Sequence, residues 1–276
     1  MSKTVMTTIA STKSIKILEL SAKIWFAVAT IGQWLFGLYV LVFYHGSTFT
    51  GDFEKWNRVL PKGYVPGDWM GNFSVAIHVL LGGIVIVGGP LQFIPSIQKR
   101  YKLLHRWLGR FYVIAMIIIG VMGLVMVWAR GSVGDQFMHV SISISALYLI
   151  LFAVLTIKNA MAKQFKTHRK MALRLFMMAN GGWFFRISVM GWILINGKPV
   201  GFDIETFSGP ALWVISVLSY SVPVALIILE LYFKAQERKK KVWVYFTTGI
   251  IMLATVIMAI GVFAAALMAW IPRIIQ

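Results

Sequence analysis

The chain has 276 residues, of which 59% are hydrophobic and 13% are charged, and its formal net charge is +18. A water-soluble domain is excluded, because the apolar residues form unbroken runs far longer than a globular core helix. The charge does not indicate nucleic acid, since the basic residues lie in short segments between these runs. The chain has no cysteine, which excludes disulfides, thiolate ligands and cysteine-held iron–sulfur clusters.

Seven apolar runs of roughly 20 residues or more are each long enough to cross a bilayer as a helix. A helix satisfies its own backbone hydrogen bonds, which a segment in lipid must do. We therefore predict an all-α membrane bundle of about seven transmembrane helices, forming a single transmembrane domain over residues 1–276. The predicted spans, in chain order, are 24–44, 73–95, 105–129, 137–157, 171–195, 209–233 and 242–270.

The charges between the spans predict the orientation of the chain. Basic clusters follow the second, fourth and sixth spans, on the same side as Lys3, Lys13 and Lys16, and the positive-inside rule makes that side cytoplasmic. Six of the nine acidic residues lie on the opposite side. We therefore expect a cytoplasmic N-terminus and an outer C-terminus, with lipid around the bundle and the bacterial inner (plasma) membrane as its location.

Within this domain we expect the spans between residues 73 and 195 to form a core four-helix bundle. The helices at 24–44, 209–233 and 242–270 are expected to flank it, and the last of them is expected to be peripheral because it carries little besides apolar residues. Residues 46–72 form the longest predicted loop, on the outer side. This loop is either an ordinary connection or a lid or partner surface over the mouth of the bundle.

Histidine is the residue type that points to chemistry. His78 and His139 lie toward the outer ends of the second and fourth spans, and His105 and His168 lie at the inner ends of the third and fifth. Two histidine pairs, one near each membrane face and drawn from alternating helices, are the arrangement that holds two haems by paired imidazoles. We therefore predict that these four histidines are metal ligands and that the cofactor is haem b, two per chain.

A flat macrocycle needs room beside each ligand. One helical turn after each histidine, on the same helix face, stands a small residue: Gly82, Gly109, Ser143 and Ala172. Each histidine taken alone is equally explained as a membrane-boundary or bundle-interior residue bonded to a backbone carbonyl. His45, which follows the first span, is either an interfacial residue or a substitute ligand for His78 or His139.

One histidine in each of four consecutive spans, paired second with fourth and third with fifth, resembles the cytochrome b561 family of transmembrane electron carriers. His105 with Trp107 two residues later is also similar to the third-span pattern of that family. Separately, the stretch from Gly88 through Leu91-Gln92-Phe93 to the run His105-Arg106-Trp107-Leu108-Gly109-Arg110 resembles an uncharacterised family of bacterial multi-spanning membrane proteins, a domain of unknown function. The first resemblance implies electron transfer through two haems, and the second implies no activity.

Arginines inside the spans are the second signal. Arg186 lies in the outer half of the fifth span, where an unpaired guanidinium is costly, so it needs an anionic partner or backbone carbonyls. A haem propionate, a quinone or an anionic substrate would serve as that partner. Arg106 and Arg110 lie at the inner end of the third span, where they reach the lipid interface or hold the propionates of an inner haem.

The leading hypothesis is a two-haem b-type cytochrome that carries electrons across the membrane, a transmembrane oxidoreductase without catalytic side chains of its own. A quinol, another small redox substrate such as an ascorbate-like reductant, or a partner protein would exchange electrons with it. The rival is a haem-free transporter or proton-coupled carrier that uses the same histidines and Arg186. A third hypothesis is a structural or assembly subunit that docks partner membrane subunits through its last helix. No phosphate-binding glycine loop, HExxH motif or nucleophile elbow supports hydrolase or nucleotide chemistry.

Overall fold

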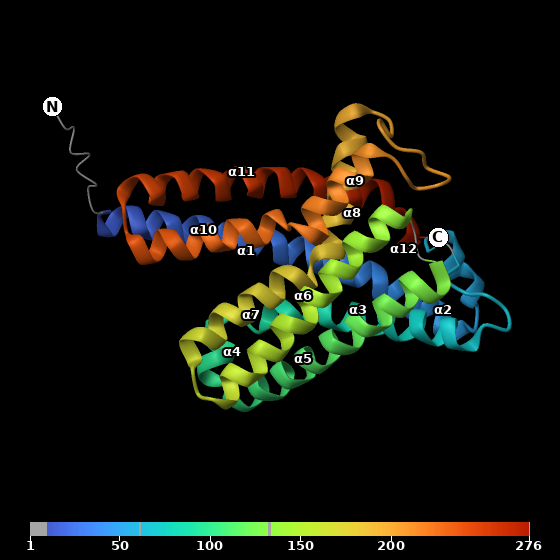
Figure 1. Cartoon of the computed structure of the whole chain (residues 1–276), viewed down its shortest axis with the longest axis horizontal. Helices are drawn as coiled ribbons and strands as arrows, with labels where there is room; N and C mark the ends of the chain where they lie inside the picture. Colours follow the sequence, from blue (N-terminus) through green and yellow to red (C-terminus); the bar gives the residue numbers. More distant parts are fainter. Residues whose placement is uncertain (1–9, 61, 132–133, 276) are drawn as a thin grey trace.

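The computed structural model describes residues 10–60, 62–131 and 134–275, so Lys3 and Pro61 lie outside the described residues. Across these residues the chain is almost entirely helical and contains no strand, only an isolated bridge between Asp203 and Ser208 (Figure 1). The predicted all-α helical bundle is therefore confirmed.

The helical elements follow one another with short connections, and several end in π-helical or 3-10 turns. They are α1 (Thr12–Val40), η1 (Leu41–His45), α2 (Gly46–Thr50), η2 (Phe53–Arg58), α3 (Trp69–Leu91), α4 (Pro95–Arg100), α5 (Lys102–Val125), η3 (Met126–Gly131), α6 (Gln136–Met161), α7 (Phe165–Ala179), α8 (Gly181–Asn196), α9 (Pro210–Ser216), η4 (Val217–Ser221), α10 (Val224–Arg238), α11 (Lys241–Ala265), η5 (Ala266–Trp270) and α12 (Ile271–Ile275).

Five helices in the described chain are long and apolar enough to cross a membrane, and a sixth crossing results if the bent pair Pro210–Ser221 and Val224–Arg238 counts as one span. The remaining predicted span, 171–195, is divided between α7 and α8, of 15 and 16 residues. Neither helix alone has the length of a full span. The membrane bundle agrees with the sequence, and the count differs at this one segment.

The division between α7 and α8 has a local cause. Asn180 leaves helical geometry, and its side-chain amide donates to the Phe176 carbonyl at 2.7 Å. Asn180 therefore competes with the backbone ladder, and Gly181 and Gly182, both poor helix formers, follow it directly. The outer half of the predicted span is thus free to pack against different neighbours from the inner half.

Two of the hydrophobic clusters in the described chain bear on the predicted core bundle. In the first, α3, α5, α6 and α7 share a layer of buried residues that includes Val85, Met116, Leu149 and Leu175. In the second, α8 packs with α1, α3 and α11. The core bundle expected over residues 73–195 is therefore built from α3, α5, α6 and α7, and α8 leaves it.

The last long helix is not peripheral, contrary to the expectation from its plain apolar sequence. In α11, 44% of the most apolar window is buried, compared with 28% to 39% in the other candidate spans. Small residues allow this burial, because Gly261 of α11 lies against the Ile187 backbone and Gly191 of α8. One face of this helix packs on α1 and α8. Another face, which includes Leu253, Val256 and Ile257, remains exposed.

The three basic clusters lie together at one end of the long axis, at the turns before α5, before α7 and before α11, and this end is called inner below (Figure 1). The described start of α1 lies at the same end, and α12 lies at the opposite, outer end. This arrangement agrees with a cytoplasmic N-terminus and an outer C-terminus.

Candidate functional site

The inner pair of histidines is well matched. His105 and His168 each lie about three residues into a helix that starts at the inner end, so a rise of about 1.5 Å per residue gives them the same depth. They are close enough for their charges to interact. The Nδ1 atom of His105 is buried without a hydrogen-bond partner. His105 and His168 therefore lie at similar depth on two helices of the core. That they hold one metal ion between them stays a prediction.

The ring of His168 has a defined orientation. Its Nδ1 lies 3.0 Å from the carbonyl oxygen of Thr156 in α6. A carbonyl only accepts, so Nδ1 carries the proton and a neutral imidazole keeps its lone pair on Nε2. This is the arrangement typical of histidine ligands, in which the second ring nitrogen donates to a backbone carbonyl.

The outer pair is less well matched. His78 lies about nine residues into α3, whereas His139 lies about three residues into α6, which corresponds to a difference in depth of about 9 Å. The residues that these two rings contact, on α5 and on η3, which continues α5, agree with this difference in depth. The His78 ring lies beside Gly123 and its Nδ1 is 3.2 Å from the Ile119 carbonyl, whereas the His139 ring lies 6.2 Å from that of Trp128.

The small residues that follow the histidines have different surroundings. A Cβ on Gly82 would meet no atom within 4 Å, whereas one on Gly109 would come within 3.3 Å of the Gln92 side-chain oxygen. The Ser143 hydroxyl accepts from the Trp128 indole at 2.9 Å and donates to the His139 carbonyl at 2.8 Å. Of Gly82, Gly109 and Ser143, Gly82 is thus the one with open space beside it.

Arg186 finds backbone and aromatic partners. Its guanidinium donates to the Gly182 carbonyl at 2.8 Å and lies 5.5 Å from the centre of the Phe36 ring. It forms no ion pair with a carboxylate of the described chain, and it acts electrostatically on His78 and on Tyr39. An anion at this place would therefore meet an unneutralised guanidinium.

Tyrosines around Arg186 are the feature that the sequence reading missed. Tyr39 and Tyr44 of the first span and Tyr220 of η4 are buried, and all three interact electrostatically with Arg186. They come from segments far apart in the chain, so their grouping was not visible in the sequence. The only available signal was the presence of tyrosines within otherwise apolar runs.

The remaining candidates lie at the edges of the bundle. Arg106 and Arg110 are exposed, and the Arg110 guanidinium lies 5.1 Å from the Trp107 ring centre on the outside of α5. Arg174 forms an ion pair with Glu230 of α10, with Nε 2.6 Å from Oε1. His45 is not an open interfacial residue, because its Nε2 is buried without a hydrogen-bond partner. No group of three or more metal-binding side chains occurs among the described residues.

The fold and these side chains define a polytopic helical membrane protein with histidines at both ends of a four-helix core. The chain belongs to the family described as "Predicted membrane protein (DUF2306)", whose model matches residues 75–229, more than half of the chain. The match includes all four histidines and Arg186. No curated protein and no solved structure is significantly similar to the chain. The resemblance to a family of unknown function is confirmed, and the resemblance to cytochrome b561 gains no support from these comparisons.

Proposed function

We propose that the protein is a b-type haem electron carrier, with one haem held between His105 and His168 near the inner face. The observation that supports the proposal is the position of these imidazoles at similar depth on two helices of one core. The orphaned Nδ1 of His105 and the fixed tautomer of His168 both fit a site for a ligated iron.

A second haem between His78 and His139 is the further part of the proposal. His78 has the same carbonyl orientation as His168, through Ile119, and open space lies beside Gly82. The depth difference between His78 and His139 makes this the weaker of the two sites.

The haem would supply the one-electron chemistry, and the protein would supply ligands and a water-free setting. The buried layer that includes Val85, Met116, Leu149 and Leu175 lies between the two histidine levels and fills the bundle with apolar side chains. Such a layer excludes water and keeps the two levels separate. We propose a quinol or an ascorbate-like reductant as donor, and either a small redox substrate or a partner protein as acceptor.

The test is the reduced-minus-oxidised absorption spectrum of the full chain, purified in detergent from haem-replete cells. We expect sharp b-type bands that His105→Ala and His168→Ala each abolish at the inner site, while His45→Ala, a matched control outside the pairs, leaves them unchanged. Each variant is checked for helicity by circular dichroism. A colourless folded protein, or bands whose intensity is undiminished after loss of both His105 and His168, would refute the inner site.

A second function is favoured by a specific observation, the unneutralised Arg186 among buried tyrosines and His78. This arrangement suits a proton-coupled carrier for an anion. If the purified protein lacks haem, we expect anion or proton flux into proteoliposomes to fall at least tenfold in Arg186→Gln. Arg110→Gln, a control at the lipid-facing edge, is expected to leave the flux unchanged.

A further inference from the structure

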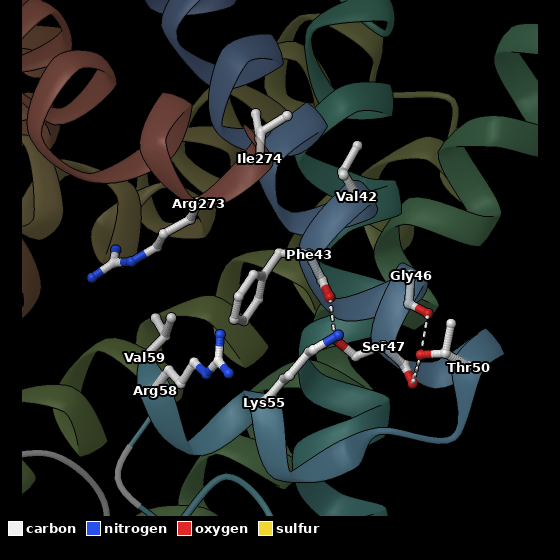
Figure 2. A pocket seen from close by; sticks show the side chains of 10 residues that line it. All are labelled: Val42, Phe43, Gly46, Ser47, Thr50, Lys55, Arg58, Val59, Arg273 and Ile274. Carbon is white, nitrogen blue, oxygen red and sulfur yellow. Dashed lines mark hydrogen bonds between the residues drawn. The ribbon is translucent and has the colours of Figure 1, made fainter. Parts of the chain in front are cut away.

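A cavity of about 390 Å³ opens at the outer end of the molecule, apart from the histidine pairs (Figure 2). Its walls come from η1 and α2, from η2 with the following Val59, and from α12. Figure 2 shows Arg273 and Ile274 entering from one wall and Lys55, Arg58 and Val59 from the opposite wall. This volume lies within the range of pockets that bind small molecules.

The charge lining this cavity is entirely positive. Lys55, Arg58 and Arg273 line it, and no acidic side chain does. Lys55 is paired with Asp52 at 3.1 Å, but neither arginine forms an ion pair with a carboxylate of the described chain. Cations brought together around a pocket repel each other, so a bound anion would relieve an unfavourable interaction.

The loop that presents Lys55 and Arg58 is held in place. The Asn57 side chain donates to the Tyr64 carbonyl and accepts from the Tyr64 N–H, both at 2.9 Å. Trp56 between these cations is only 1% exposed and packs on Tyr44. The pocket is therefore largely preformed, and a ligand would not need to order the loop on binding.

The chemistry of the lining defines the class of ligand. Phe43, Val59 and Ile274 provide apolar contact beside the cations. The Ser47 and Thr50 hydroxyls already donate to backbone carbonyls, so they offer no free donor to the ligand. The donors left for an oxyanion are the two arginines and the N–H groups that Lys55 does not give to Asp52. Arginine forks match carboxylate and phosphate geometry.

We propose that this outer cavity binds an oxyanion, a carboxylate or a phosphate attached to an apolar body, between Arg58 and Arg273. The anion is either a free solute or the head group of an anionic lipid, since both carry the same chemistry. The inference is independent of haem and of the histidine pairs.

The probe is phenyl phosphate, titrated by calorimetry into the full chain in phosphatidylcholine nanodiscs. We expect saturable binding that weakens about tenfold or more in Arg58→Gln and in Arg273→Gln, as for loss of one charge-assisted hydrogen bond. Arg58→Lys and Arg273→Lys keep the charge but lose the fork, so their affinity should lie between that of the unaltered chain and that of the glutamine variants. Lys198→Gln, an exposed outer cation away from the cavity, should leave the affinity unchanged. Absence of saturable binding, or equal affinity in all variants, overturns the proposal.

Nanodiscs containing phosphatidylglycerol distinguish the two sources of the anion. If a lipid head group occupies the cavity, phenyl phosphate binding to the unaltered chain should be lost in phosphatidylglycerol and present in phosphatidylcholine. If the ligand is a free solute, the affinity should be the same in both lipids. Benzyl alcohol, which lacks the charge, should not bind in either.

Discussion

The close approach of α8 and α11 at Gly261 gives the sharpest structural prediction. A Cβ on Gly261 would lie 2.6 Å from the Ile187 carbonyl oxygen and 3.1 Å from its carbonyl carbon. Both atoms are backbone, so no side-chain rotation relieves the clash and the two helices must move apart. Overpacking of this kind costs about 1–3 kcal/mol. We therefore expect Gly261→Ala to destabilise the protein by about that amount.

The assay is intrinsic tryptophan fluorescence during thermal unfolding in detergent. At ~2–4 °C per kcal/mol for a chain of this size, Gly261→Ala should lower Tm by about 2–12 °C. The control lies on the same helix, because a Cβ on Gly249 would meet no atom within 4 Å. Gly249→Ala should be neutral or stabilising by up to about 1 kcal/mol, since alanine is the better helix former. Equal Tm values for the two variants would refute the packing of α11 against α8.

Three further predictions follow from single contacts. Glu230→Gln should cost about 1 kcal/mol in the same unfolding assay, because it breaks the partly exposed ion pair with Arg174 that ties α7 to α10. The buried Arg130 guanidinium donates to the Asn72 side chain at 2.8 Å, so Arg130→Gln should lower the stability of the fold by about 1–3 kcal/mol. It should also speed amide hydrogen exchange in the loop at residues 62–68. An unchanged exchange rate would show that other contacts hold this loop. Hydrogen bonds from the Thr206 N–H and hydroxyl lower the pKa of Asp203. The stability that these bonds give the outer turn is therefore present above about pH 4 and is lost as pH falls through the lowered pKa. An NMR titration midpoint of Asp203 at or above the ordinary value would contradict this.

Much of the candidate site could be predicted because helix geometry relates sequence position to depth. The inner placement of His105 and His168 follows from the basic turns that precede them, and no tertiary information was needed for it. The depth difference between His78 and His139 was harder to predict. Their helices begin at Trp69 and Gln136, and the sequence did not place these two helix starts to better than several residues. The nearness of Tyr39 and Tyr220 to Arg186 was also invisible, since these tyrosines come from other spans.

The sequence by itself determined that the chain is an all-α membrane bundle with its basic turns on one side, because hydropathy and charge act on each segment alone. Only the tertiary structure decided which helices pack together, that the helix is interrupted at Asn180, and that α11 packs against α1 and α8. The physical reason is that lipid is as apolar as leucine, so hydropathy does not distinguish a lipid-facing helix from a packed one. The outer cavity likewise exists only after folding, because Phe43, Arg58 and Arg273 come from distant parts of the chain.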